Sequence, residues 1–173
     1  MGKRSSFERN PRDYYKTPFS AVEALIARKD EFHIRSFAEP CAGDGSLARH
    51  LGSVWRCVEL SDIEPQAPEV AKRDAFDITE TEADCFITNP PWSRDVMHPL
   101  LEHIVNIKPV WFLLDSDWCH TRQASLYMKN FCVEIISIGR VKWIENSANT
   151  GKDNCCWYLF DKDKTDDTIF IGR

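Results

Sequence analysis

The stretch Ser36-Phe37-Ala38-Glu39-Pro40-Cys41-Ala42-Gly43-Asp44-Gly45-Ser46-Leu47 decides the fold of this chain. Residues 34–38 before the proline are predicted to form a strand, and Pro40 ends it because proline cannot continue a central strand. Gly43 and Gly45 can adopt positive φ and leave room for a ligand beside the backbone. A short helix is predicted to follow. Strand, glycine turn and helix together are typical of a ligand-binding junction in an α/β fold.

A second junction follows about one βαβ unit later, in Cys85-Phe86-Ile87-Thr88-Asn89-Pro90-Pro91-Trp92. The first residues form an apolar run that reads as a buried strand, and two successive prolines hold the next backbone extended. The Asn89 amide oxygen and the Pro90 carbonyl can each accept one N–H, while Trp92 can stack on a flat ring. This arrangement is suited to binding a flat ring that carries an exocyclic amino group. The other interpretation is a simple turn with an aromatic residue packed beneath it.

An acidic residue stands where nucleotide-binding α/β folds grip a ribose. A predicted strand at residues 55–60 is followed by Asp62, about 20 residues after the glycine turn. A weaker strand at residues 70–73 leads to Asp74. Both aspartates have an alternative role as ordinary loop caps, because aspartate is common in turns.

The rest of the chain alternates between apolar strands and helices. Further elements are predicted at residues 18–28, 96–105 and 121–129 as helices, and at residues 109–114, 131–138, 155–160 and 168–171 as strands. Residues 140–144 either extend the strand at 131–138 or form a second strand. Near-continuous apolar strands that alternate with helices indicate a mostly parallel sheet covered on both faces. The two closely spaced strands near the end of the chain suggest an antiparallel hairpin at the sheet edge.

Length and charge limit the classes of protein to which the chain can belong. Its 173 residues fit one domain, expected at residues 13–173, preceded by a flexible arm at residues 1–12. A net charge of −5 counts against a broad basic nucleic-acid surface. The arm itself is basic, and it either contacts phosphate or is a solvated terminus.

Cysteine usage and hydropathy indicate the compartment. The seven cysteines form no C-x-x-C pair, which favours reduced structural thiols in the cytoplasm and no metal site. No apolar run is long enough to cross a membrane and no signal-peptide pattern opens the chain. We therefore expect a cytoplasmic protein without a membrane or a metal.

Three stretches in this order resemble the class I S-adenosylmethionine-dependent methyltransferases, specifically the small phage and bacterial type that acts on N6 of adenine in DNA. Tyr15-Lys16-Thr17-Pro18 is similar to the segment before that family's first helix. The residues from Glu39 to Gly45 are similar to its glycine-rich cofactor loop. Asn89-Pro90-Pro91-Trp92 matches its catalytic segment. Residues 139–143 and 157–158 extend the likeness weakly to the last strands, so it covers nearly the whole chain.

Two departures from the family stand out. Lys16 replaces a proline of the family's first segment. In addition, no target-recognition domain follows the last strand, so sequence selectivity is expected to come from loops, a protein partner or a homodimer, or to be weak.

The resemblance implies a doubly wound, mostly parallel seven-stranded sheet with an antiparallel strand near the C-terminus, a Rossmann-like fold. It implies S-adenosyl-L-methionine as cofactor and DNA as partner, with the target adenine flipped out. The implied catalytic residues are Asn89, Pro90, Pro91 and Trp92. The implied cofactor-binding residues are Tyr15, Thr17, Glu39, Cys41, Gly43, Asp44, Gly45, Asp62, Ile63, Asp74, Ala75, Phe76 and Asn89.

Other interpretations of the same residues stay open. The acceptor is alternatively an RNA adenine or a protein glutamine, and a non-catalytic methyltransferase-like partner subunit is a third reading. Cys41 follows a proline, as does the nucleophile of cytosine methyltransferases, but its place in the cofactor loop favours a structural role. Trp143 is expected in the core, and Trp118 either lines the target pocket or simply packs.

Overall fold

The structure, a computed structural model, describes residues 14–144 and 153–173. The arm expected at residues 1–12 lies outside the described residues, as does most of the stretch 145–154, whose polar, glycine-containing sequence predicts a loop. The helices are α1 (Phe19–Ala27), α2 (Ser46–Leu51), α3 (Arg94–Val105) and α4 (Ser125–Asn130), with 3₁₀ turns η2 (Ala75–Asp77) and η3 (Ser116–His120). The strands are β1 (Ser36–Glu39), β2 (Arg56–Asp62), β3 (Ala71–Lys72), β4 (Cys85–Thr88), β5 (Val110–Asp115), β6 (Cys132–Arg140), β7 (Asn154–Phe160) and β8 (Ile169–Ile171).

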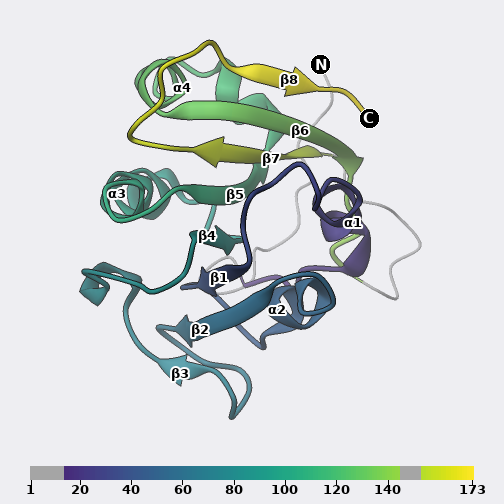
Figure 1. Ribbon diagram of the computed structural model, residues 1–173, viewed down its shortest axis with the longest axis vertical. Coiled ribbons are helices and arrows are strands. Elements are labelled where there is room, and N and C mark those ends of the chain that lie inside the picture. The colour runs from purple at the N-terminus through teal and green to yellow at the C-terminus, as the bar shows by residue number, and fades with distance from the viewer. Residues whose placement is uncertain (1–13, 145–152) are drawn as a thin grey trace.

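These strands form one sheet in the order β3-β2-β1-β4-β5-β7-β6-β8 (Figure 1). All neighbouring pairs are parallel except those of β7, which runs antiparallel to β5 and to β6. The prediction of a mostly parallel sheet with an antiparallel strand near the C-terminus is confirmed. The described sheet has eight strands rather than seven, because β8 pairs with β6. The expected hairpin therefore lies inside the sheet and not at its edge.

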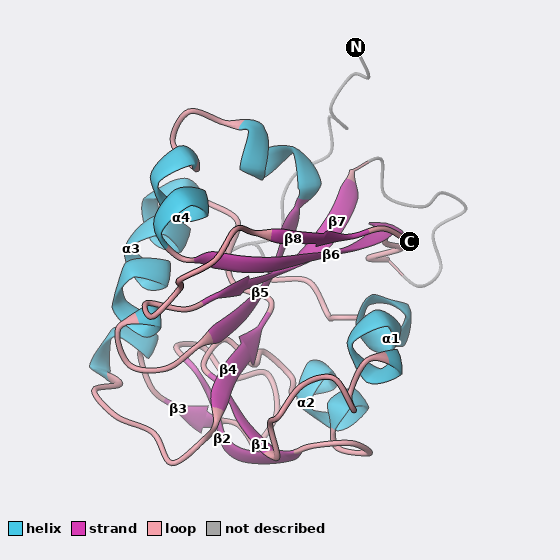
Figure 2. Cartoon of the chain, turned by 45° about the horizontal axis from the view of Figure 1, so that its top comes forward, coloured by secondary structure: helices cyan, strands magenta, loops and turns pink. Residues whose placement is uncertain are grey.

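Helices cover both faces of the sheet, with α1 and α2 on one side and α3 and α4 on the other (Figure 2). The hydrophobic core has two parts, one on each face of the sheet, because successive side chains of a strand point to opposite faces. In β5, Phe112 and Leu114 pack with α3, whereas Trp111 and Leu113 pack with α1 and α2. The sheet is thus buried on both sides, as its continuous apolar strands require.

Three local predictions were wrong in ways that concern the site. Thr17 does not cap α1, since Pro18 is the capping residue in an extended conformation and the Thr17 side chain bonds elsewhere. The helix expected at residues 121–129 begins later, at Ser125, after the η3 turn. No strand forms at residues 141–144, because β6 ends at Arg140 and leaves Trp143 in the following loop.

Candidate functional site

A cavity of about 690 Å³ opens where β1, β2 and β4 end. Chain order reverses between β1 and β4, and open α/β sheets bind ligands at this crevice beyond the carboxyl ends of their strands. The predicted site residues that line it are Tyr15, Thr17, Glu39, Cys41, Gly43, Asp44, Asp62, Ile63, Asp74, Ala75, Phe76, Asn89 and Pro91. Three others do not line it, namely Gly45, Pro90 and Trp92.

The glycine turn wraps one side of the cavity and is tied to the end of β2. The Gly43 amide donates to Asp62 Oδ2 at 2.8 Å, and the Gln66 amide donates to the Gly43 carbonyl at 2.9 Å. Gly43 has φ 55°, and a β-carbon there would collide with the ring of Tyr14. Gly45, at φ 76°, supplies the left-handed turn into α2 instead of a cavity wall. Sequence reasoning missed Tyr14, whose signal was its place beside the matched segment.

Glu39 is the most unusual residue of the cavity wall. It is 2% exposed, and its Oε2 has no hydrogen-bond partner among the described residues. Burial raises the pKa of this carboxyl well above its ordinary value, and the nearby Asp62 and Asp44 raise it further. An unsatisfied buried polar atom costs about 1–3 kcal/mol, so a ligand that donates a hydrogen bond here would remove a penalty.

Asp44 contrasts with Glu39 because it is already well satisfied. The Ser46 amide and hydroxyl donate to Asp44 Oδ1 at 3.0 and 2.6 Å, and Lys16 Nζ lies 3.0 Å from Oδ2. Burial opposes ionisation of Asp44, yet the hydrogen bonds from Ser46 and Lys16 outweigh it and lower its pKa. Asp44 is therefore a fixed anion at the cavity rim.

Asp62 and Asp74 act as loop caps and also line the cavity, so their two predicted roles are compatible. Asp62 accepts from the amides of Gly43 and Glu64, the latter at 2.7 Å, and Asp74 accepts from the Phe76 amide at 3.0 Å. A carboxylate has about four acceptor positions, so each retains capacity for a ligand hydroxyl or amine.

Apolar side chains flank this same end of the cavity. Ile63 is 47% exposed and Phe76 is 43% exposed, although both line a pocket. Such exposed apolar faces beside two hydrogen-bond acceptors suit a flat, polar-edged ring.

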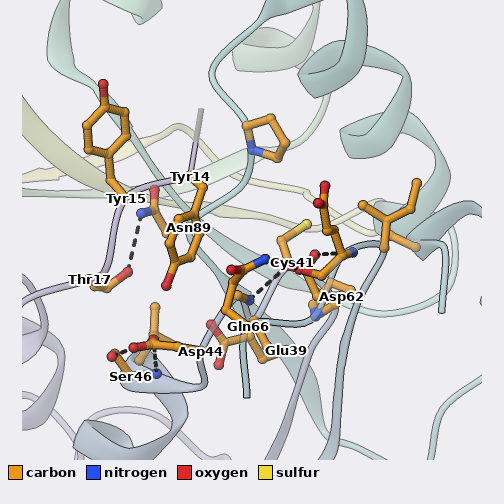
Figure 3. Close-up of a pocket in the computed structure, with 18 of the residues that line it drawn as sticks. Tyr14, Tyr15, Thr17, Glu39, Cys41, Asp44, Ser46, Asp62, Gln66 and Asn89 are labelled. Carbon is orange, nitrogen blue, oxygen red and sulfur yellow. Dashed lines mark hydrogen bonds between the residues drawn. The ribbon is translucent and has the colours of Figure 1, made fainter. Parts of the chain in front are cut away.

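Asn89 lies at the other end of the cavity, held by a segment that precedes α1. Its amide nitrogen donates to Thr17 Oγ1 at 3.2 Å, as the dashed line in Figure 3 marks. This bond turns the amide oxygen away from Thr17. Thr17 is 5% exposed, so the contact is shielded from competing water. The arrangement presents one oriented carbonyl oxygen at the strand end.

Trp92 lies beside the cavity and is anchored by its edge. Its indole N–H donates to the Leu113 carbonyl at 2.9 Å, and its ring meets Trp143 edge-on at 5.7 Å between centroids. Trp143 in turn lies 6.4 Å from the ring of Tyr15. Trp143 was expected in the core, but it is only half-buried in the loop after β6. These three aromatic residues form a cluster next to Asn89.

Packing and burial bear on two open questions of the sequence. Trp118 is 5% exposed, donates to His98 Nε2 at 3.1 Å and packs edge-on against Tyr158, which fits simple packing. Burial raises the pKa of the Cys41 thiol to about 12, so it is not a reactive thiolate at neutral pH. All seven cysteines are free.

The described residues hold no group of three or more His, Cys, Asp or Glu side chains that could bind a metal ion. Among the helices at residues 14–144 and 153–173, none has the length and apolar character needed to cross a membrane.

Comparison with known proteins gave matches in structure only. No protein-family model matches the sequence, and no curated protein matches it. A putative RNA methyltransferase, PH1948 from Pyrococcus horikoshii, aligns over 92% of this chain and 94% of its own with TM-score 0.69 and 16% identity. A putative class I S-adenosylmethionine-dependent methyltransferase from Listeria monocytogenes aligns over 95% and 67% with TM-score 0.61 and 11% identity.

A chain of a type I R-M system aligns over 90% of this chain but only 44% of its own, with TM-score 0.61 and 13% identity. At these identities the likeness concerns the fold. The chain has the Rossmann-like fold of class I methyltransferases.

Proposed function

We propose that this protein is an S-adenosylmethionine-dependent methyltransferase that acts on the N6 amino group of adenine in DNA. The observation that carries the proposal is the Asn89 amide, which Thr17 holds with its oxygen turned away, beside the cavity at the ends of β1, β2 and β4. The fold likeness to class I methyltransferases supports the same reading.

The cavity residues fit this cofactor by charge. Five carboxyl side chains line the cavity among the described residues, against a single basic one, so it favours a cationic ligand. Glu39 Oε2, which has no hydrogen-bond partner in the described part of the chain, would accept from the cofactor's ammonium. Asp62 would accept from the ribose hydroxyls and Asp74 from the adenine amine, with Ile63 and Phe76 beside the ring. When bound, the cofactor supplies an electrophilic methyl group on a sulfonium.

The target amine would be held by two acceptors at the end of β4. The nitrogen lone pair of an adenine N6 is delocalised into the ring, which makes it a weak nucleophile. The Asn89 side-chain oxygen and the Pro90 carbonyl would each accept one N6–H and draw the nitrogen toward tetrahedral geometry. The same two dipoles stabilise positive charge that develops on the nitrogen, and they need no reorganisation during the reaction.

The aromatic cluster would receive the flipped base. Flipping an adenine out of a duplex costs a few kcal/mol. Stacking of the base on an aromatic face contributes roughly 1–3 kcal/mol and offsets part of that cost. Trp92 is held edge-on to Trp143 by its bond to Leu113, whereas Tyr15 lines the cavity. The cluster of Tyr15, Trp92 and Trp143 therefore offers faces from three separate segments.

A second candidate is methylation of an RNA adenine, which the likeness to the putative RNA methyltransferase favours. The two amines present the same N6 group, so the cavity by itself serves both. The likeness to a chain of a type I R-M system, described for its complex assembly, supports recognition by a partner chain.

Methyl transfer from labelled cofactor to DNA and to RNA tests both candidates, followed by nucleoside analysis. The expected product is N6-methyladenine in DNA, and an Asn89→Ala variant should lose about 100-fold or more in kcat while it still binds cofactor. Label only in RNA would favour the second candidate. Cofactor binding without label on any nucleoside would reject both.

A further inference from the structure

The charge pattern of the cavity assigns a role to Lys16, a residue that departs from the family pattern. Lys16 is the one basic residue among the described residues that line the cavity, whose wall also holds five carboxyl groups. A ligand with both an ammonium and a carboxylate can satisfy Glu39 with the first. Its carboxylate would then lie among acidic side chains and needs a cation.

We propose that Lys16 binds the carboxylate of the cofactor's methionine end, and that it exchanges Asp44 for that carboxylate when the cofactor enters. This inference rests on the proposed function. In the structure Lys16 Nζ lies 3.0 Å from Asp44 Oδ2, with the lysine side chain 63% exposed. Exposed ion pairs contribute only about 0–1 kcal/mol, so a second carboxylate can replace the first at little cost.

Asp44 stays satisfied when Lys16 turns away. Ser46 donates to it twice, and Arg49 Nη2 lies 3.6 Å from Oδ2. Arg49 also donates to the Asp44 backbone carbonyl at 2.6 Å, which keeps the guanidinium nearby. The loss of one partner therefore does not leave an unpaired buried anion, the situation that makes breaking a charge pair expensive.

The position of Lys16 in the chain also suits this role. Its neighbour Thr17 holds Asn89, and Tyr14 on its other side packs on Gly43. The segment from Tyr14 to Thr17 therefore lies along the cavity from the glycine turn to the catalytic amide. A lysine in this segment can follow a ligand carboxylate without moving the two contacts that flank it, because its four-carbon stem is flexible.

The test compares two ligands by calorimetry. S-adenosylhomocysteine carries the carboxylate, and 5′-deoxy-5′-(3-aminopropylthio)adenosine keeps the thioether and amine without it. Lys16→Met should weaken S-adenosylhomocysteine binding about tenfold and leave the second ligand within about twofold. Lys16→Arg should retain most of the affinity. Lys29→Met serves as matched control, because Lys29 pairs with Asp30 at 2.8 Å on the surface and lies outside the cavity lining.

A double variant separates direct binding from an effect through Asp44. With Asp44→Asn in the background, Lys16→Met should still weaken S-adenosylhomocysteine about tenfold. Loss of the Lys16 effect in that background, or equal losses for both ligands, would overturn the inference while the proposed function stands. Wild-type protein that binds neither ligand would overturn the proposed function and this inference with it.

Discussion

The amide of Asn89 donates to the hydroxyl of Thr17 across 72 residues of sequence, at 3.2 Å. This bond joins the segment before α1 to the end of β4, and so connects two matched stretches directly. Orientation of a side-chain amide decides which atom faces a substrate, since its nitrogen donates and its oxygen accepts. The position of Thr17 is therefore part of the geometry of the proposed catalytic segment, although Thr17 belongs to neither β4 nor the turn that follows it.

Replacing Thr17 with valine should lower kcat more than it lowers cofactor affinity. Valine keeps the shape of the side chain but cannot accept from Asn89, so the amide loses a bond of about 1 kcal/mol and its fixed orientation. We expect roughly a tenfold drop in kcat, which corresponds to about 1.4 kcal/mol. Thr17→Ser retains the hydroxyl and should stay near wild type. A fall in cofactor affinity as large as the fall in kcat would contradict this role.

Trp92→Phe should reduce stability without a change in cofactor binding. Phenylalanine cannot donate to the Leu113 carbonyl, and the loss of a partly buried hydrogen bond costs about 1–2 kcal/mol. The indole does not line the cavity, so cofactor affinity should be unchanged. Urea unfolding and calorimetry measure the two quantities. Unchanged stability together with weaker cofactor binding would show that the bond to Leu113 is not its main role.

Gly43→Ala should impair both stability and cofactor binding. Residues other than glycine lose about 1–2 kcal/mol at the left-handed φ of 55°, and the new methyl group would also displace the Tyr14 ring. Gly52→Ala is the matched control because its φ of −60° is helical and suits alanine. Adding Tyr14→Ala should recover the steric part of the loss and leave the conformational part. Equal stability of the two glycine variants, by urea unfolding, would contradict the assignment.

The sequence predicted the sheet and much of the cavity because both depend on local patterns. Apolar runs that end in turn residues locate β1, β4 and β5, and the glycine turn and Asn89 follow from their own residue types. Parallel strands then place these ends at one edge. The insertion of β7 and the pairing of β8 with β6 involve choices among distant segments, which periodicity does not encode.

Three contacts at the site that the sequence did not predict also depend on pairing between distant segments. Thr17 followed by Pro18 has the pattern of a helix cap, but a distant partner, Asn89, holds its hydroxyl instead. Stacking by Trp92 on a flat ring stays a prediction, but its bond to the Leu113 carbonyl was not foreseen because it depends on the neighbouring strand β5. Lys16 appeared only as a departure from a family pattern. In each case the contact joins residues that lie far apart in sequence.

Glu39→Gln should stabilise the ligand-free protein and weaken cofactor binding at the same time. Below the ordinary carboxyl pKa of 4.5 the folded and unfolded states are both protonated at Glu39, so this residue adds no pH dependence. Above that pH the unfolded chain loses the proton while the buried carboxyl, with its raised pKa, keeps it. Wild-type stability therefore falls as pH rises from about 4.5 toward the folded pKa.

The glutamine variant lacks this slope, so its free energy of unfolding should exceed that of wild type increasingly from pH 5 to pH 8 in urea unfolding. Glu23→Gln on the exposed side of α1 is the control and should follow the wild-type profile. A nearby ammonium favours the ionised form of Glu39, so this carboxyl can release its proton when the ligand binds and meet the ammonium as an anion, which a glutamine amide cannot do. S-adenosylhomocysteine should therefore bind the variant at least about tenfold more weakly by calorimetry. If the free energies of unfolding of Glu39→Gln and wild type change with pH in parallel, the buried carboxyl ionises without penalty. If the affinity for S-adenosylhomocysteine is unchanged, Glu39 does not contact the ligand.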